Sequence, residues 1–293
     1  MGEGDERAQC SEFAEVIGLI PAAGQSRRLQ PLPCSKEVLP IGFHVDARTG
    51  HLAPKVVGHY LLEKFRAAGI RKTYIVIRDG KWDIPGYFRD GDLVDMCLAY
   101  VVISGSCGPL DTIDRAYPFV ARNRIAFGFP DILFDPPDAY ARLIRRQEET
   151  AADVVLGLHR IADPRSWDMV ETGDDGRVRR IEMKPATTEL TFGWHFAVWT
   201  PAFTEFLHRF LRSEQTKRDM GRIRAAGSDA GGDLAAGTVL QAALAEGIVV
   251  HSVSFPDGAP HDIGSPENLR SAPAWSDGRN HGREVFAGTL EGR

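Results

Sequence analysis

The stretch Val16–Pro40, VIGLIPAAGQSRRLQPLPCSKEVLP, is the most informative part of this chain for fold and chemistry. Its first five residues form an apolar, β-branched run, which predicts a buried strand that ends at Pro21. The small residues Ala22, Ala23 and Gly24 come next, and a turn of small residues lets the backbone approach a ligand closely. The stretch therefore predicts a strand followed by a ligand-binding turn.

Three basic residues, Arg27, Arg28 and Lys36, follow this turn. Outward-facing backbone amides together with fixed cations suit a triphosphate, because both stabilise negative charge. Small residues after a strand and paired arginines are also common in proteins that bind no phosphate. Composition alone leaves both interpretations open, and the order of the residues favours phosphate binding.

The overall composition fits one large folded domain. The chain has 293 residues, 43% of them hydrophobic, and a formal net charge of −5, so it can bury a full core. It shows neither a basic stripe nor an apolar run of about 18 residues, which argues against nucleic-acid and membrane partners. The four cysteines lack metal-ligand spacing and the N-terminus lacks an apolar signal region, so we expect a cytoplasmic protein.

Strand-like and helix-like segments alternate after the opening stretch. Buried strands are predicted at residues 73–77, 98–103 and 124–129, and apolar residues at helical spacing predict helices at residues 57–68 and 113–120. This alternation predicts an α/β fold, a three-layer sandwich with a mostly parallel, Rossmann-like central sheet. Ligands in such folds bind at the carboxyl ends of the strands, which is where the opening turn lies.

The order of residues in the opening stretch resembles the signature of the sugar-1-phosphate nucleotidyltransferases, or nucleoside-diphosphate-sugar pyrophosphorylases. In that signature a small-residue turn leads to Arg-Leu, a proline, Ser-Lys or Pro-Lys, and then Leu-Pro. This chain has the matching residues in the same order: Ala22-Ala23-Gly24, Arg28-Leu29, Pro31, Ser35-Lys36 and Leu39-Pro40.

Further matches extend the resemblance over about residues 16–270. It implies the nucleotide-diphospho-sugar transferase fold, with the nucleotidyltransferase domain at residues 15–270. We expect residues 1–14 to form a flexible tail and residues 271–293 to form a C-terminal tail.

The resemblance also implies a Mg²⁺ site made by Asp131 and Asp262. Asp131 follows a predicted strand where the family has Leu-Gly-Asp, with Pro130 in place of the glycine. Asp262 lies in the segment His261–Leu269, HDIGSPENL, which is similar to a family segment near the C-terminus. An aspartate after a strand is more often a turn former, so this metal assignment depends on the resemblance.

The acceptor side is implied by two further segments. Ile181–Pro185, IEMKP, resembles a family hairpin whose lysine grips the phosphate of the sugar 1-phosphate, and Gly193–Pro201 resembles the strand that walls the sugar pocket. Met183 stands where the family has a glutamate and Asp168 where it has a glycine, so the acceptor stays open. The implied substrate-binding residues are Asp168, Glu171, Met183, Lys184 and Gly193.

The nucleotide side departs from the family at the base. Ile103 stands where a glutamine normally recognises the pyrimidine edge, and Gly108-Pro109-Leu110 replaces Gly-Thr-Ala. Base selection is therefore not decided by the sequence. The implied nucleotide-binding residues are Ala22, Ala23, Gly24, Arg27, Ile103 and Gly108.

The resemblance implies Mg²⁺-dependent transfer of a nucleotidyl group from an NTP, with dTTP or UTP favoured, to a sugar 1-phosphate, yielding an NDP-sugar and pyrophosphate. The implied catalytic residues are Arg28 for the leaving pyrophosphate, Lys36 for the α-phosphate and Lys184 for the acceptor phosphate. A homo-oligomer is compatible with the sequence. Two alternatives stay open: a cytidylyltransferase acting on a small amine-bearing phosphate or phosphonate, and a nucleotide-binding regulatory homologue without turnover.

Overall fold

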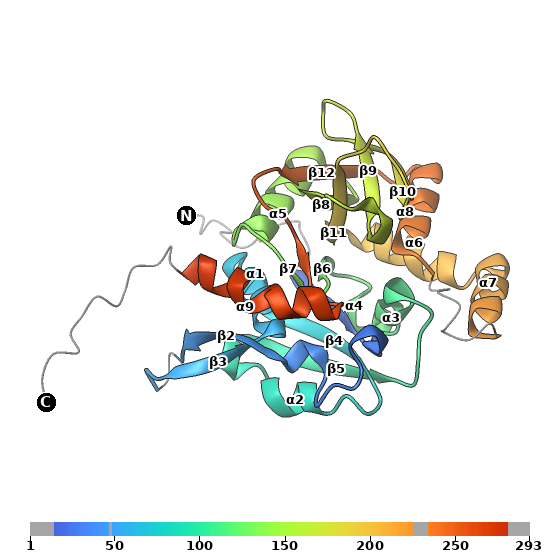
Figure 1. Cartoon of the computed structure of the whole chain (residues 1–293). Coiled ribbons are helices and arrows are strands. Elements are labelled where there is room, and N and C mark those ends of the chain that lie inside the picture. Colours follow the sequence, from blue (N-terminus) through green and yellow to red (C-terminus); the bar gives the residue numbers. More distant parts are fainter. Residues whose placement is uncertain (1–14, 47–48, 226–233, 281–293) are drawn as a thin grey trace, which may run out of the picture.

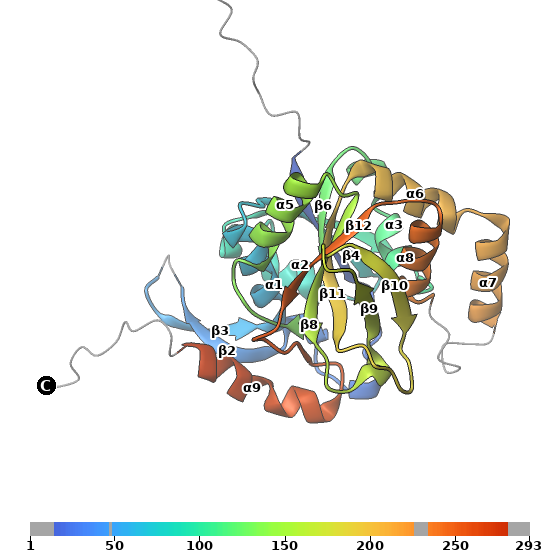
Figure 2. The same cartoon turned by 90° about the horizontal axis from the view of Figure 1, so that it is seen from above.

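A computed structural model describes residues 15–46, 49–225 and 234–280 (Figure 1). The flexible tail predicted at residues 1–14 lies outside these ranges. The described chain forms a mixed, mostly parallel sheet with helices packed on both faces, as the view from above shows (Figure 2). The predicted three-layer α/β fold is confirmed. Within the described ranges, no helix combines the length and apolar character needed to cross a membrane.

The main sheet of the described residues has nine strands. Seven follow the order β10-β9-β11-β6-β1-β4-β5, and β8 pairs with both β11 and β12. β1 runs parallel to β4 and β6, and β4 runs parallel to β5, whereas β11 runs antiparallel to β6. The strands are β1 Val16–Ala22, β4 Lys72–Arg78, β5 Cys97–Ile103, β6 Arg124–Gly128, β8 Val154–Arg160, β9 Asp168–Thr172, β10 Val178–Met183, β11 Phe192–Trp199 and β12 Val250–Phe255.

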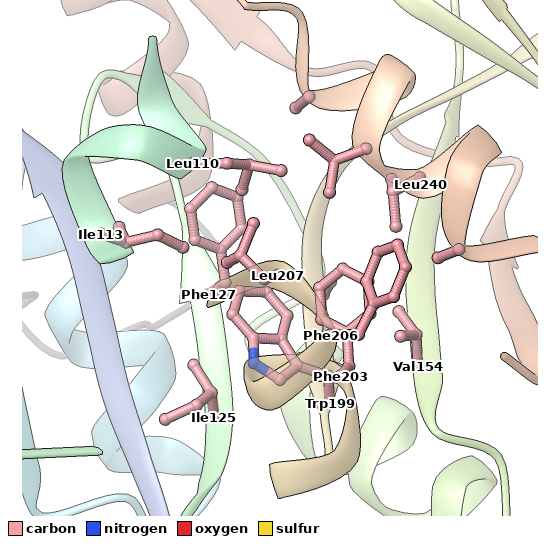
Figure 3. Packing of buried hydrophobic residues seen from close by; sticks show 14 of the residues in the cluster. Leu110, Ile113, Ile125, Phe127, Val154, Trp199, Phe203, Phe206, Leu207 and Leu240 are labelled. Carbon is pink, nitrogen blue, oxygen red and sulfur yellow. The ribbon is translucent and has the colours of Figure 1, made fainter. Parts of the chain in front are cut away.

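The helices form two layers because successive strand residues face opposite sides of the sheet. In β6, Ile125 and Phe127 belong to one hydrophobic cluster and Ala126 to the other. Figure 3 shows the first cluster, in which α3, α6 and α8 pack on the sheet. Its helices are α3 Pro109–Asp114, α4 Tyr117–Val120, α6 Pro201–Leu211, α7 Glu214–Ala225 and α8 Ala236–Ala245; the second cluster contains α1 Val57–Ala67, α2 Asp83–Phe88 and α5 Ala139–Thr150.

A smaller layer lies beside the main sheet. It consists of the hairpin β2 Pro40–Val45 and β3 Leu52–Val56, the short pair β7 Ile132–Leu133 and β13 His261–Asp262, and helix α9 Pro266–Asn280. Ile41 of β2, Leu133 of β7 and Ala272 of α9 share one hydrophobic cluster. The boundary expected at residue 270 therefore falls inside α9, and Ala272, two residues beyond it, is buried in this cluster.

Two predicted element boundaries differ from the structure. β1 continues through Pro21, which lies beside Val76 of β4; pairing with β6 has ended by Leu19, so only one neighbouring strand is present where proline lacks an N–H. The helix predicted at residues 113–120 is wrong as a single element. It is divided between α3 and α4, because Pro118 has no N–H to continue the helical hydrogen bonds.

Candidate functional site

Two pockets open at the carboxyl ends of β1 and β6 and share Pro109, Phe129 and Asp131. The first, which we call the turn pocket, has a volume of about 410 Å³. The second, the hairpin pocket, has a volume of about 380 Å³ and borders the β9–β10 hairpin. The turn pocket is lined by Pro21, Ala23–Arg27, Lys36, Glu37, Arg78, Ser106, Gly108, Pro109, Thr112, Phe129 and Asp131. The hairpin pocket is lined by Arg28, Pro109, Phe129, Asp131, Ile132, Arg165–Asp168, Lys184, Trp194, His195, Leu234–Ala236 and Asp262.

The turn after β1 is held by a partly buried lysine. Lys81 Nζ donates to the carbonyl oxygens of Ala22 (2.8 Å) and Gly24 (3.3 Å) and to both carboxylate oxygens of Glu37 (2.8 Å each). Glu37 is 2% exposed. Because its charge is balanced by Lys81, the pair fixes the turn to the segment that carries Lys36.

The turn differs in detail from the expectation. Gly24 lines the turn pocket without a positive φ angle, and a Cβ added there would meet no atom within 4 Å. The left-handed residue is Ser26, with φ of 51°. Gly24 is therefore not required for the bend itself. Gly108, at φ 122°, does require a glycine, since a Cβ there would lie 2.6 Å from the carbonyl oxygen of Leu234.

The structure brings Asp131 and Asp262 together through the β7–β13 pair. Asp262 pairs with Ile132, the residue after Asp131, and the N–H of Ile263 donates to the carbonyl oxygen of Asp131 at 3.0 Å. Lys36 Nζ donates to Asp131 Oδ2. Arg28 Nη2 lies 4.0 Å from Asp262 Oδ2. Two carboxylates and two cations thus meet where the pockets join.

The pKa values of this group reflect burial and mutual charge. Burial raises the pKa of Asp131, but the charge and hydrogen bond of Lys36 outweigh it and the net shift is downward. Burial lowers the pKa of Lys36, but the charges of Asp131 and Glu37 reverse the shift, so the pKa is raised. Burial, followed by the charge of Asp131, raises the pKa of Asp262. A further positive charge beside Asp262 would therefore stabilise the ionised form of this carboxylate.

The hairpin pocket contains two of the predicted substrate residues. Lys184 lies directly after β10 with a positive φ of 43°. Asp168 begins β9 and is 9% exposed, and its Oδ2 accepts the N–H of Gly237 at 2.8 Å. Asp168 Oδ1 and Trp194 Nε1 are both buried without a hydrogen-bond partner among the described residues. Asp168 therefore caps the start of α8 as well as lining the pocket.

Five predicted residues do not line the pocket expected for them. Ala22 is buried beneath the turn, and Ile103 lines a groove outside the turn pocket. Met183 is 46% exposed and its sulfur accepts from Thr238 Oγ1. Glu171 pairs with Arg180 at 2.9 Å, and Gly193 packs against Ile161 and the backbone of Asp168, so neither lines the hairpin pocket.

Several lining residues were not anticipated from the sequence. Arg78, Ser106 and Thr112 line the turn pocket, and Trp167 lines the hairpin pocket. Arg78 directly follows a predicted strand, and this position at the strand's carboxyl end could have indicated that it lines a pocket. Trp167 carries no such signal, because only the pairing of β9 with β10 and β11 brings it to the pocket. Trp194, which also lines the hairpin pocket, lies in the segment Gly193–Pro201 that the resemblance already indicated as the pocket wall.

No family model matches the chain. A glucose-1-phosphate thymidylyltransferase of Streptomyces griseus is 27% identical over 172 residues, which cover 57% of this chain and 44% of that protein. A UTP–glucose-1-phosphate uridylyltransferase of Synechocystis is 25% identical over 185 residues, covering 58% of this chain and 45% of that protein.

The chain is a homologue of the sugar-1-phosphate nucleotidyltransferases. The alignment spans about half the length of the curated relatives it matches. Two solved structures share the nucleotide-diphospho-sugar transferase fold with this homologue. One is a Bacillus anthracis protein described as a glucose-1-phosphate thymidylyltransferase, in complex with sucrose, with a TM-score of 0.70, 16% identity and coverage of 94% of this chain and 98% of that one. The other is a UDP-glucose pyrophosphorylase with UDP-glucose, with a TM-score of 0.70, 18% identity and coverage of 92% and 100%.

Proposed function

We propose that this protein transfers a nucleotidyl group from an NTP to a sugar 1-phosphate and releases pyrophosphate. The observation that carries the proposal is the junction of two pockets at Asp131, with a cation on each side of it. Lys36 belongs to the turn pocket and Lys184 to the hairpin pocket. Such an arrangement suits two phosphorylated substrates that react where the pockets meet.

The turn pocket would hold the nucleotide. Backbone amides of the turn at residues 23–27, together with Arg27 and Lys36, offer donors and positive charge to a triphosphate. Lys36 is mostly buried and its pKa is raised, so it stays charged at neutral pH. A fixed buried cation stabilises charge that develops on the α-phosphate better than a solvated one.

The hairpin pocket would hold the acceptor. Lys184 supplies the positive charge for its phosphate, while Trp167 and Trp194 provide apolar walls for the rest of the molecule. Met183 does not line this pocket, so its replacement of a glutamate has less influence on the acceptor than the sequence suggested. Asp168 is the acidic group that faces the acceptor together with Asp131 and Asp262.

Asp131 and Asp262 fit a Mg²⁺ ion. No group of three or more histidine, cysteine, aspartate or glutamate side chains suited to a metal occurs in the described residues. Two carboxylates are sufficient, because Mg²⁺ in phosphoryl-transfer sites takes its other ligands from substrate phosphates and water. The raised pKa of Asp262 beside Asp131 indicates that a cation is favourable there. When bound, Mg²⁺ would neutralise phosphate charge.

The reaction needs positioning and charge neutralisation more than proton transfer. The acceptor phosphate oxygen attacks the α-phosphorus, the bond to the β-phosphate oxygen breaks, and pyrophosphate leaves with the electron pair. A phosphate dianion is already nucleophilic, so no general base is required. Lys36 steadies the α-phosphate, Lys184 the attacking phosphate, and Arg28, whose side chain is 68% exposed, is free to follow the leaving group.

The relatives are named for thymidylyl and uridylyl transfer, so dTTP and UTP are the reference donors for this proposal. Asp168 supports a second acceptor class. Its buried carboxylate could pair with an ammonium group, so a small amine-bearing phosphate or phosphonate is the second candidate acceptor.

Pyrophosphate release tests the proposal directly. The protein would be incubated with ATP, CTP, GTP, UTP or dTTP and with glucose 1-phosphate, glucosamine 1-phosphate or phosphoethanolamine, with and without Mg²⁺. We expect release only when an NTP, a sugar 1-phosphate and Mg²⁺ are all present. Asp262→Asn should abolish it, whereas Asp95→Asn, at an exposed ion pair with Arg71, should not. Nucleotide binding without pyrophosphate release from any pair would instead support a regulatory homologue.

A further inference from the structure

Arg78 lies at one end of the turn pocket and has no role in the proposed transfer. It is the last residue of β4 and pairs with Ile103, the last residue of β5. Its side chain lines the turn pocket and also an outer groove, the edge groove, formed by Val101–Ser106 and Arg115. It does not line the hairpin pocket. Arg78 therefore lies in a part of the turn pocket that the hairpin pocket does not share.

The guanidinium of Arg78 has no partner within the described part of the chain. Its Nε is buried and has no hydrogen-bond partner among the described residues, and no carboxylate among them forms an ion pair with it. A Cβ added to Gly105 would lie 3.1 Å from Arg78 Nη2, so the absence of a side chain at Gly105 leaves room for the guanidinium. A buried donor without a partner is unfavourable, which indicates that a ligand group completes this position.

The ligand group at this end is the nucleobase if the α-phosphate lies at the other end. The end shared with the hairpin pocket contains Asp131, where the phosphates react in the proposed function. The turn at residues 23–27 would hold the remaining phosphates along one side. Ser106, Gly108 and Arg78 then surround the space left for the base.

We propose that Arg78 binds the edge of the base and selects one with two adjacent hydrogen-bond acceptors. Arginine offers only donors, and its planar fork matches a pair of acceptors. Guanine presents such a pair at O6 and N7, and cytosine at O2 and N3. Uracil and thymine place the N3–H donor between their two carbonyl oxygens, so a bidentate contact would oppose a donor to a donor. Adenine has no such pair.

This inference rests on the proposed function. It predicts a cytosine or guanine nucleotide as donor, whereas the relatives are named for thymidylyl and uridylyl transfer. The test is kcat/KM for CTP, GTP, UTP, dTTP and ATP, measured by pyrophosphate release. We expect CTP or GTP to exceed UTP and dTTP by about ten- to a hundredfold, as a good bidentate base contact does; the CTP and GTP arms identify which base it is. Arg78→Met should remove the difference.

Two further variants sharpen the test. Arg78→Gln offers one donor and one acceptor, so UTP and dTTP should gain relative to CTP and GTP. Arg71→Met changes an exposed arginine that precedes the opposite end of β4, and it should leave all five values unchanged.

The outcomes that overturn the inference are separate from failure of the function. A preference of the unmodified protein for UTP or dTTP overturns it, and so does an equal loss for all five nucleotides in Arg78→Met, which would indicate a phosphate contact. If no nucleotide releases pyrophosphate, the proposed transfer fails, and calorimetric titration with the same nucleotides still tests the base. Tighter binding of CTP or GTP that disappears in Arg78→Met supports the inference; equal affinities overturn it.

Discussion

At the scale of single residues, Lys36 connects the chemistry of the two pockets. Its side chain is 15% exposed and bonded to Asp131, which belongs to both pockets. Burial opposes the charge of Lys36, and the nearby carboxylates restore it. A cation held this way is preorganised, because its position is set before any substrate binds.

Lys36→Ala and Arg28→Ala should each lower kcat by about a hundredfold or more, since each removes a positive charge from the transition state. The measurement is pyrophosphate release at saturating Mg²⁺, with circular dichroism to check folding. Lys72→Ala, at an exposed lysine paired with Glu15, is the matched control and should keep normal turnover. Near-normal rates in either site variant would place the phosphate-binding cations elsewhere.

At the scale of elements, α8 depends on a residue far from it in sequence. The residue before this helix is Ala235, which has no polar side chain to accept the first N–H groups. Asp168 Oδ2 accepts the N–H of Gly237 instead. The start of β9 and the start of α8 are thereby joined beside the hairpin pocket.

Asp168→Ala should lower the free energy of unfolding by about 1–2 kcal/mol, as loss of a helix cap does. Asp168→Asn keeps an oxygen acceptor and should cost much less. Gly237→Ala should also destabilise, against the higher helix propensity of alanine, because the added Cβ would lie 2.8 Å from Asp168 Oδ2. Urea denaturation measures all three, and equal losses for Asp168→Ala and Asp168→Asn would contradict the cap.

At the scale of the whole molecule, helices cover both faces of the sheet. Several histidines are therefore buried. Burial, followed by the charges of His44 and Lys55, lowers the pKa of His59 to about 3. Burial, followed by the charge of Lys64, lowers the pKa of His159 to about 4. Burial also lowers the pKa of His195 well below its usual value. The folded protein therefore holds these imidazoles neutral.

Stability should fall as the pH decreases from about 6.5 to about 4, since the unfolded chain binds protons there and the folded chain does not. Each imidazole contributes about 1.4 kcal/mol per pH unit in this window. His59 Nδ1 accepts the N–H of Val56 at 3.1 Å, so His59→Asn keeps an acceptor while removing the titration. Urea denaturation across pH 4–7.5 should show a shallower decline in this variant; a flat profile in the unmodified protein would refute the expectation.

The sequence by itself determined the class of fold and indicated many of the residues that line the two pockets. Local apolar runs marked β1, β4, β5 and β6 within two residues at their ends, because a buried strand has a local hydrophobic signature. The order of residues around Arg28, Lys36, Asp131, Lys184 and Asp262 indicated the homologues that the comparisons found. These features are contained in short segments, so they could be recognised without coordinates.

Tertiary structure alone decided which side chains share a pocket. Asp131 and Asp262, 131 positions apart in sequence, meet because β7 pairs with β13, and Asp168 caps a helix that begins almost 70 residues later. Met183 and Ile103 were predicted as contacts, but the hairpin and the edge strand carry them outside the pockets. Arg78 enters the turn pocket because parallel strands end together. Such contacts depend on long-range strand pairing, which no local sequence pattern encodes.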